Sequence, residues 1–184
     1  MRIKDKIKRP RRPVVAYEIL PPREKDGTLN SYAANISSLL SQTHIDAINI
    51  PEVRDEVARG ERPIKNQIRA EPREFGRLLQ DIVGIEAIIN RVVVHQDMEK
   101  EITWLEETNK KYEIENLITV GGESRSIKYP GPSVNQALAA ISKNQKLDLL
   151  CGGISIPSRE KESLRLIEKS ENGAEFFTTQ VLYD

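Results

Sequence analysis

The stretch Val14-Val15-Ala16-Tyr17-Glu18-Ile19-Leu20-Pro21-Pro22-Arg23 decides how the rest of the chain is interpreted. It is short, apolar apart from one carboxylate, and rich in residues that favour strands. A proline pair closes it, and because proline lacks an N–H donor, a strand cannot continue past Pro21. Glu18 stands near this end, where burial of an unpaired carboxylate would be costly. We therefore predict a first strand with a carboxylate close to its carboxyl end.

Glu18 is the first candidate for a catalytic residue. Barrel enzymes place their catalytic groups at the carboxyl ends of buried strands. The alternative is that Glu18 points outward or pairs with a neighbouring Lys or Arg, and the spacing alone leaves both interpretations open.

The composition is that of a globular protein with one core. The 184 residues are 38% hydrophobic and 30% charged. Their apolar runs are far shorter than the roughly 20 residues of a membrane helix, and the start lacks the apolar region of a signal peptide. We therefore predict a cytoplasmic protein without a membrane partner. The single cysteine, Cys151, excludes an intramolecular disulfide and is expected to be buried. With only His44 and His95, we expect no metal site.

The charge is balanced, with 28 basic and 28 acidic residues, so the whole chain gives no indication of a nucleic-acid partner. Residues 1–13 are the exception, because they carry seven basic side chains against Asp5 alone. Such a basic arm is either a solvated extension, which is the usual outcome, or a contact for an anionic partner. We treat residues 1–13 as an arm and residues 14–184 as the folded domain.

Strands and helices are predicted to alternate along the domain. Apolar runs that predict strands cover residues 14–20, 46–50, 88–94, 116–120, 147–151 and 174–182. Helical periodicity or capping residues predict helices between them, with Pro72, Asp97, Ser133 and Ser158 at four of their starts. Residues 52–70 are polar and irregular, as functional or mobile loops are. Repeated strand and helix units of this kind predict a parallel sheet.

Two parallel architectures fit this order. A doubly wound sheet would accommodate six strands, but the first turn lacks a glycine-rich phosphate motif. Glu18, His95, Glu123 and Gln180 all fall at or just after strand ends on one predicted face, as in a (β/α)₈ TIM barrel. Because a complete barrel takes about 250 residues, we predict an incomplete barrel of about six units. Its open edges would need cover, for which a homo-oligomer is one solution.

Three motifs resemble those of the methylenetetrahydrofolate reductases. Residues 17–23, Y-E-I-L-P-P-R, resemble the family's F-E-F-F-P-P-[KR], and residues 120–123, V-G-G-E, resemble its L-R-G-D. Residues 169–184 resemble its K-x-x-A-G-A-x-x-x-I-T-Q-x-x-x-D through Lys169, Gly173-Ala174, Thr179-Gln180 and Asp184. The motifs occur in the family's order and extend from the first predicted strand to the sixth.

The resemblance implies a flavin-dependent TIM-barrel oxidoreductase of one-carbon metabolism and methionine biosynthesis. Such an enzyme reduces a methylene-pterin to its methyl form with FAD, which takes a hydride from NAD(P)H or from a reduced partner subunit. Glu18 matches the glutamate that acts as the general acid, and its burial is expected to favour the neutral form. Glu123 matches an aspartate near the pterin and flavin rings, and Gln180 matches a glutamine that binds substrate.

The resemblance also implies a set of flavin contacts. Lys169 matches a flavin-contacting lysine, with a solvated lysine in a last helical turn as the alternative. The glycines at Gly121, Gly122 and Gly153 could bring backbone N–H groups close to a phosphate or a ring, or could serve only as turn residues.

Two departures from the family concern the flavin. Ile156 replaces the histidine of the family's Y-P-E-x-H-P stretch, and Gly121 replaces the arginine of L-R-G-D. We therefore expect weak flavin binding. His95 has no counterpart in the family and is either a local hydrogen-bonding residue or a catalytic one.

Three functions remain open at this point. A reductase acting on folate or an analogous pterin leads, and a non-redox barrel subunit that binds the pterin or passes its methyl group to a partner protein is the alternative. An inactive fragment is the third.

Overall fold

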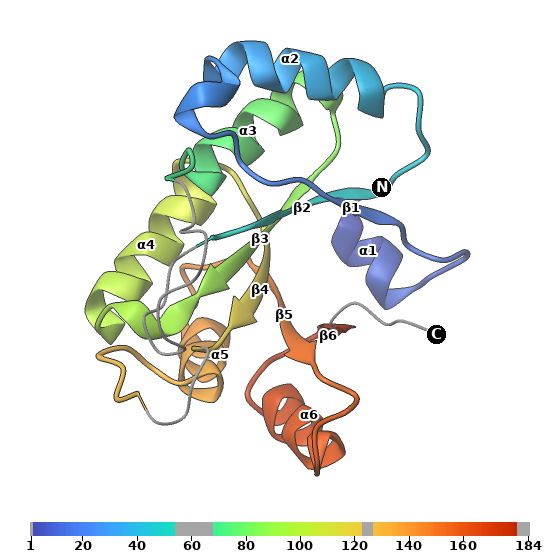
Figure 1. Ribbon diagram of the computed structural model, residues 1–184. Coiled ribbons are helices and arrows are strands. Elements are labelled where there is room, and N and C mark those ends of the chain that lie inside the picture. The colour runs from blue at the N-terminus through green and yellow to red at the C-terminus, as the bar shows by residue number, and fades with distance from the viewer. Residues whose placement is uncertain (1, 54–67, 123–126, 180–184) are drawn as a thin grey trace.

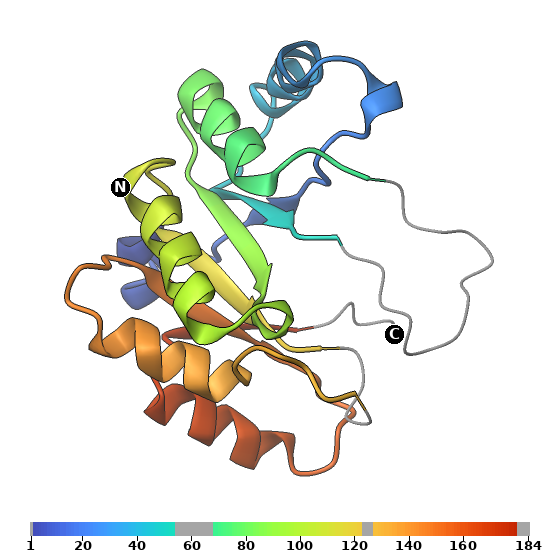
Figure 2. The same cartoon turned by 90° about the vertical axis from the view of Figure 1, so that its left-hand side faces the viewer.

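The computed structural model describes residues 2–53, 68–122 and 127–179. Six parallel strands form one curled sheet, with helices between them (Figures 1 and 2). The strands are β1 (Ala16–Glu18), β2 (Ala47–Pro51), β3 (Ala87–Val92), β4 (Asn116–Val120), β5 (Leu150–Ser155) and β6 (Phe176–Thr179). The helices are α1 (Ile3–Lys8), α2 (Leu29–Leu40), α3 (Pro72–Val83), α4 (Met98–Lys110), α5 (Val134–Lys143) and α6 (Glu162–Glu171), with short 3₁₀ turns η1 (Glu24–Asp26) and η3 (Val93–His95).

The strand order identifies the architecture. Each strand pairs in parallel with the next one in the chain, from β1 to β6. A doubly wound sheet would instead reverse its order at a switch point. The described chain is therefore an incomplete TIM barrel, which confirms the predicted fold class.

Three of the four predicted helix starts are confirmed. The side chain of Asp97 accepts a hydrogen bond from the backbone N–H of Lys100 at the start of α4. Ser133 forms a reciprocal capping box with Gln136 at the start of α5. Pro72 occupies the first turn of α3, where its missing N–H has no cost.

The fifth unit differs from the prediction in two ways. The strand extends over Leu150–Ser155 instead of residues 147–151, because Gly152 lies inside it. A side-chain carbon at Gly152 would come within 2.5 Å of the Phe176 ring on β6, so the glycine makes room for that ring. The helix that follows begins at Glu162 and not at Ser158, after Lys161 in a left-handed conformation.

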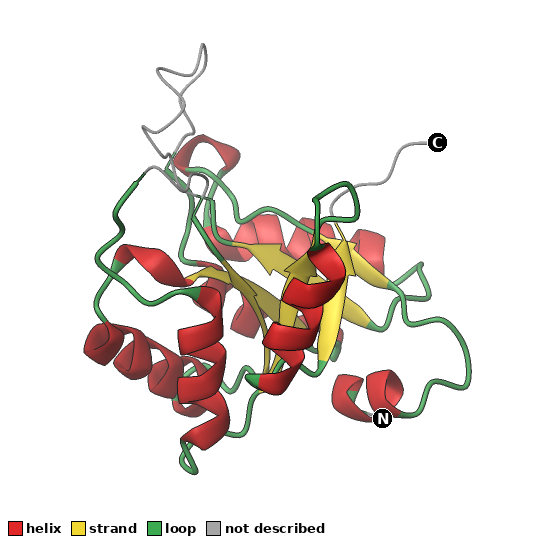
Figure 3. Ribbon diagram, turned by 90° about the horizontal axis from the view of Figure 1, so that it is seen from below, coloured by secondary structure: helices red, strands yellow, loops and turns green. Residues whose placement is uncertain are grey.

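The two faces of the sheet have different surroundings, because alternate residues of a strand face opposite sides. The outer face packs against helices α2 to α5 and carries the larger core, with Ile48, Ile89 and Leu117 fully buried. We call the inner, concave face the lumen. The buried apolar residues that the strands place on it are Ala47, Ile88, Ile118 and Leu150. In Figure 3 the strands lie in the middle of the molecule with helices around them.

Helix α1 covers the amino-terminal end of the lumen. Ile3 is only 1% exposed and packs against the lumen residues just named. The basic side chains of this segment pair with carboxylates near the strand starts: Arg2 with Glu115, Lys4 with Asp148, Lys6 and Arg12 with Asp46, and Lys8 with Glu175. Residues 3–8 are thus not the solvated extension that their charge predicts, because an apolar anchor and these carboxylates fold them onto the sheet.

Within the described ranges, no helix has both the length and the apolar character needed to cross a membrane.

Candidate functional site

Glu18 ends β1 at the carboxyl-terminal edge of the sheet and pairs in register with Asn49 of β2. The side-chain amide of Asn49 donates a hydrogen bond of 2.9 Å to Oε2 of Glu18. Glu18 is exposed, so the prediction that it is buried is wrong for the described chain. The physical reason is that β1 has only one paired neighbour, β2, within the described sheet. Among the described residues its partner is a neutral amide and not the Lys or Arg of the alternative interpretation.

Two lumen asparagines present acceptors beside this carboxylate. Asn49 shares the face of Ala47, and Asn90 of β3 shares the face of Ile88, so both side chains lie on the lumen side. The Oδ1 atoms of Asn49 and Asn90 are buried and have no hydrogen-bond partner among the described residues. A buried acceptor without a partner costs about 1–3 kcal/mol. Such atoms in a lumen are natural contacts for the N–H groups of a ligand.

Sequence reasoning missed both asparagines. A signal was available, because each interrupts an apolar strand, in A-I-N-I-P and I-I-N-R-V, on the face that Glu18 shares. Polar residues that replace apolar ones inside a strand predict such a site.

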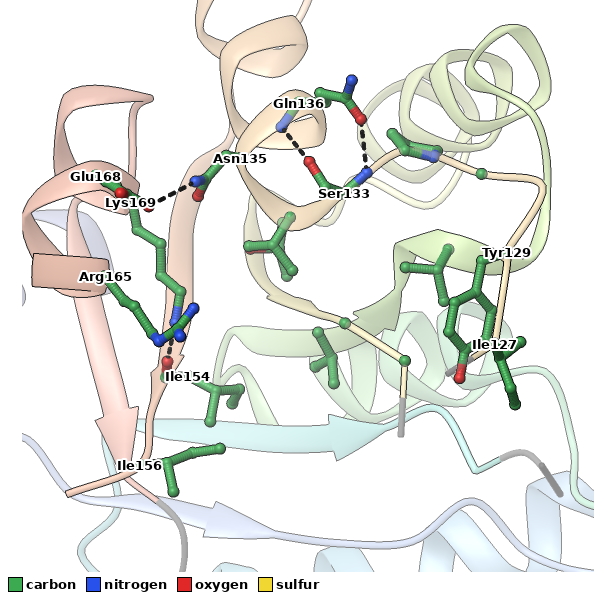
Figure 4. A pocket seen from close by; sticks show the side chains of 18 of the residues that line it. Ile127, Tyr129, Ser133, Asn135, Gln136, Ile154, Ile156, Arg165, Glu168 and Lys169 are labelled. Atoms are coloured by element: carbon green, nitrogen blue, oxygen red, sulfur yellow. Dashed lines mark hydrogen bonds between the residues drawn. The ribbon is translucent and has the colours of Figure 1, made fainter. Parts of the chain in front are cut away.

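A cleft of about 1130 Å³ opens at the carboxyl ends of β4 and β5, between α5 and α6 (Figure 4). Its apolar wall is formed by Val94, Val120, Ile127, Tyr129, Val134, Ile154 and Ile156. Its polar wall includes Ser133, Asn135 and Gln136 at the start of α5, and Arg159, Arg165, Glu168 and Lys169 after β5. This volume exceeds what a single small metabolite needs and suits a ligand of nucleotide size.

The polar wall of the cleft has a surplus of positive charge. The carboxylate of Glu162 is 5% exposed and lies 3.7, 4.0 and 3.8 Å from Arg159, Arg165 and Lys169, respectively. Glu162 therefore faces three cations, and with Glu168 counted the wall still has one more positive than negative side chain. The amino terminus of α5 adds its own partial positive charge. An anionic group is the ligand that this wall favours.

Lys169 lines this polar wall, and its contact with a flavin stays a prediction. Its side chain is 12% exposed, and Nζ donates a hydrogen bond to the carbonyl oxygen of Ile154 at the end of β5. Burial lowers the pKa of Lys169, although the nearby Glu162 opposes that shift. The alternative of a freely solvated lysine is therefore wrong.

The three candidate glycines have different surroundings. Gly121 lines the cleft, and among the described residues a side-chain carbon there would meet Val134 alone, at an ordinary contact distance of 3.4 Å. At Gly122 the same atom would come within 2.2 Å of the Tyr129 ring, so this glycine is required by the packing of the cleft wall. Gly153 is buried and does not line the cleft; its α-carbon faces the aliphatic stem of Lys169.

The remaining candidate residues are Glu123, Gln180, His95 and Cys151. Glu123 and Gln180 lie outside the described residues, so their roles stay predictions. The rings of His95 and Tyr129 pack edge to face with centroids 5.7 Å apart, which connects His95 to the cleft wall. Cys151 is buried as predicted, and burial raises the pKa of its thiol to about 12.

FAD is the cofactor that the resemblance implies, and the cleft can be compared with its needs. An isoalloxazine ring needs an apolar wall, which Ile154, Ile156 and Tyr129 offer. A diphosphate needs cations and N–H donors, which Arg165, Lys169 and the start of α5 offer. The cleft therefore fits an aromatic ligand that carries anionic groups. The family's histidine and arginine are absent from it, because Ile156 and Gly121 occupy their positions.

No known protein family and no curated protein matches the sequence. The resemblance to the methylenetetrahydrofolate reductases thus rests on the three motifs alone.

Solved structures with the same fold do match. One is an uncharacterized protein from Clostridium thermocellum that binds two copies of 5-methyl-5,6,7,8-tetrahydrofolic acid, with 23% identity and a TM-score of 0.67. The match covers 99% of this chain and 59% of that one. Another is the 4-hydroxy-tetrahydrodipicolinate synthase of Methylacidiphilum fumariolicum SolV, with 21% identity and a TM-score of 0.52 over 88% of this chain and 52% of that one. At these identities the likeness shows a shared TIM-barrel fold, of which this chain spans little more than half.

Proposed function

We propose that the protein binds a reduced pterin carrying a one-carbon group in the lumen beside Glu18, and that it reduces the methylene form to the methyl form. The observation that carries this proposal is the lumen cluster of the Glu18 carboxylate and two amide oxygens that have no hydrogen-bond partner in the described part of the chain. A pterin ring presents N–H donors along its pyrimidine edge, and these complement the oxygens of Asn49 and Asn90. Glu18 at the strand end is then close enough to give a proton to a ring nitrogen.

The β4–β5 cleft is the proposed place for the electron carrier. FAD bound there, once reduced by NAD(P)H or by a reduced partner, would supply the hydride. Arg165 and Lys169 would hold its phosphates, and Ile154 and Ile156 would exclude water from one side of its ring. The motif around Lys169 supports this assignment, and the chain's own residues otherwise only bind and orient the group.

A non-redox function is the second candidate. The similar protein from Clostridium thermocellum binds a methylated reduced folate, and two family flavin contacts are replaced here. On this alternative the lumen and the cleft each hold a pterin with its anionic tail, and the methyl group passes to a partner protein.

A spectrum and a titration separate the candidates. The absorption spectrum of the purified protein is first recorded between 350 and 500 nm. The protein and its Asn49→Leu and Asn90→Leu variants are then titrated with 5-methyltetrahydrofolate by calorimetry. A flavin spectrum, together with binding that both variants weaken, supports the reductase. A colourless protein that still binds the ligand supports the non-redox function. Absence of binding at millimolar ligand would contradict both.

A further inference from the structure

A buried charge network lies directly behind the lumen asparagines. Arg91 of β3 is 1% exposed and donates to Glu101 of α4, from Nε at 3.0 Å and from Nη2 at 2.7 Å. Its Nη1 donates to Oε1 of Glu52 at 2.8 Å. The guanidinium also lies 4.2 Å from the centroid of the Trp104 ring. Each of the three guanidinium nitrogens of Arg91 therefore donates to a carboxylate, which holds this segment of β3 in one position.

Glu52 connects this network to β2. It follows Pro51, which pairs with Asn90 but has no N–H to donate to the ladder. The backbone N–H of Glu52 donates to the carbonyl oxygen of Asn90 at 3.0 Å. Its carboxylate accepts from the backbone N–H of Val92 at 2.9 Å. Glu52 thus extends the pairing of β2 with β3 beyond the proline, through its side chain.

These contacts fix the backbone at Asn90 and at the two residues that follow it. Its own carbonyl is held by Glu52, and the next two residues, Arg91 and Val92, are held by the Glu52 carboxylate. Because side chains alternate along a strand, fixing Arg91 toward the helices fixes Asn90 toward the lumen. The same contacts fix the end of β2, two residues after Asn49.

We infer that Glu52 and Arg91 are positioning residues for the lumen site, because they hold the amide groups of Asn49 and Asn90 in their orientation beside Glu18. The inference deepens the proposed function and rests on it for the identity of the ligand. Neither residue touches the ligand itself, and both act through the two asparagines.

If Glu52 and Arg91 only stabilised the fold, their loss would have the same effect as the loss of another buried arginine. Arg73 is the matched control for that comparison. Arg73 is 7% exposed on its side chain and lies 4.4 Å from the centroid of the same Trp104 ring. Its ion-pair partners, Glu71 and Glu107, belong to the start of α3 and to α4. Glu71 also acts electrostatically on Arg91, but among the described residues no hydrogen bond joins either carboxylate to β2 or β3. Loss of Arg73 should therefore destabilise the protein without reaching the asparagines.

The test compares Glu52→Gln, Arg91→Lys and Arg73→Lys by thermal unfolding, side-chain amide NMR and calorimetry with 5-methyltetrahydrofolate. We expect Glu52→Gln and Arg91→Lys to move the side-chain amide resonances of Asn49 and Asn90. We also expect them to weaken ligand affinity about tenfold or more, because a displaced acceptor loses its hydrogen bond. Arg73→Lys should lower the melting temperature. It should leave the asparagine resonances unmoved and the ligand affinity within twofold of the parent value.

Different results would contradict the positioning role and the proposed function. Unmoved asparagine resonances in folded Glu52→Gln and Arg91→Lys protein, or equal shifts in Arg73→Lys, would overturn the positioning role. If Glu52→Gln does not fold, Arg91→Lys decides by the same criteria, and loss of folding in both would assign the network to stability alone. Absence of ligand binding by the parent protein would instead overturn the proposed function, since the resonances are read without ligand.

Discussion

Arg12 binds both carboxylate oxygens of Asp46, from Nη1 to Oδ2 at 2.9 Å and from Nη2 to Oδ1 at 2.7 Å. Asp46 precedes β2, is 2% exposed on its side chain, and also accepts from the backbone N–H of Val15 at 2.9 Å. This fork ties the segment before β1 to the start of β2. The basic residues near the amino terminus therefore act in the fold, where they neutralise carboxylates at the amino-terminal end of the barrel.

The first prediction concerns the stability that Asp46 contributes. The backbone N–H of Val15, together with Lys6 and Arg12, holds the pKa of Asp46 well below its usual range, although burial opposes that shift. A carboxyl with a lowered folded pKa stabilises the protein above its unfolded pKa of about 3.9, and this stability is lost as the pH falls through the folded value. Asp46→Asn should lower the free energy of unfolding at pH 7 by about 1–3 kcal/mol.

Asp148→Asn is the control for this prediction, measured by urea unfolding between pH 3 and pH 7. Asp148 also pairs with a lysine of α1, but its side chain is 63% exposed, so the loss should stay below about 1 kcal/mol. The acid sensitivity of Asp46→Asn should also be smaller than that of the parent. Equal losses of unfolding free energy in the two variants would show that the buried contacts of Asp46 stabilise the protein no more than an exposed ion pair does.

The second prediction concerns Lys169 and the anionic part of a ligand in the cleft. Lys169→Met should weaken FAD binding about tenfold or more, because a hydrogen bond to a charged group is lost, and should leave riboflavin binding unchanged, because riboflavin has no phosphate. Fluorescence quenching of the two flavins measures both affinities. Lys143→Met, at an exposed lysine in the last turn of α5, is the control. A loss of the same size for riboflavin would assign Lys169 to the shape of the cleft and not to phosphate binding.

The third prediction concerns the two departures from the family. Ile156 lines the cleft, and a side-chain carbon at Gly121 would make an ordinary contact with Val134 and no clash with the described residues. The double variant Ile156→His with Gly121→Arg should therefore bind FAD more tightly than the parent, which we expect to bind it weakly. Ile156→Leu controls for a change of shape alone. A parent protein that purifies with stoichiometric FAD would show that the two family side chains are not needed here.

The architecture followed from the sequence because its signals are local. Val14 to Leu20, the proline pair after them and the capping residues Asp97 and Ser133 each act within a few positions. The interval between units then left few topologies to choose from. The strand boundaries were less accurate where glycine was involved, since the place of Gly152 depends on the Phe176 ring of another strand.

The site was harder to predict because its parts interact over long sequence separations. Asn49 binds Glu18 across 31 positions, and Arg91 binds Glu52 across 39. In the sequence, Arg91 is one charge in a strand, and nothing local shows that Glu101 meets it behind the sheet. Helix α1 was not predicted for the same reason, because its basic side chains pair with carboxylates that lie together only after the strands have assembled.

The last prediction concerns Glu18 itself. Its carboxylate is exposed and is held by a neutral amide, so its loss should cost little stability, within about 0.5 kcal/mol for a surface site. Glu18→Gln keeps the size and a hydrogen-bonding oxygen for Asn49 but removes the transferable proton. We therefore expect unchanged melting and pterin affinity, and a single-turnover rate of methylene-pterin reduction lower by about 10²-fold or more. Flavin reduction by the electron donor should proceed normally, since no proton passes to the pterin in that step. Glu24→Gln, at an exposed glutamate in the turn after β1, should match the parent in every measurement. A destabilised Glu18→Gln protein whose folded fraction reduces the pterin at the parent rate would make Glu18 a structural residue and end its assignment as the acid.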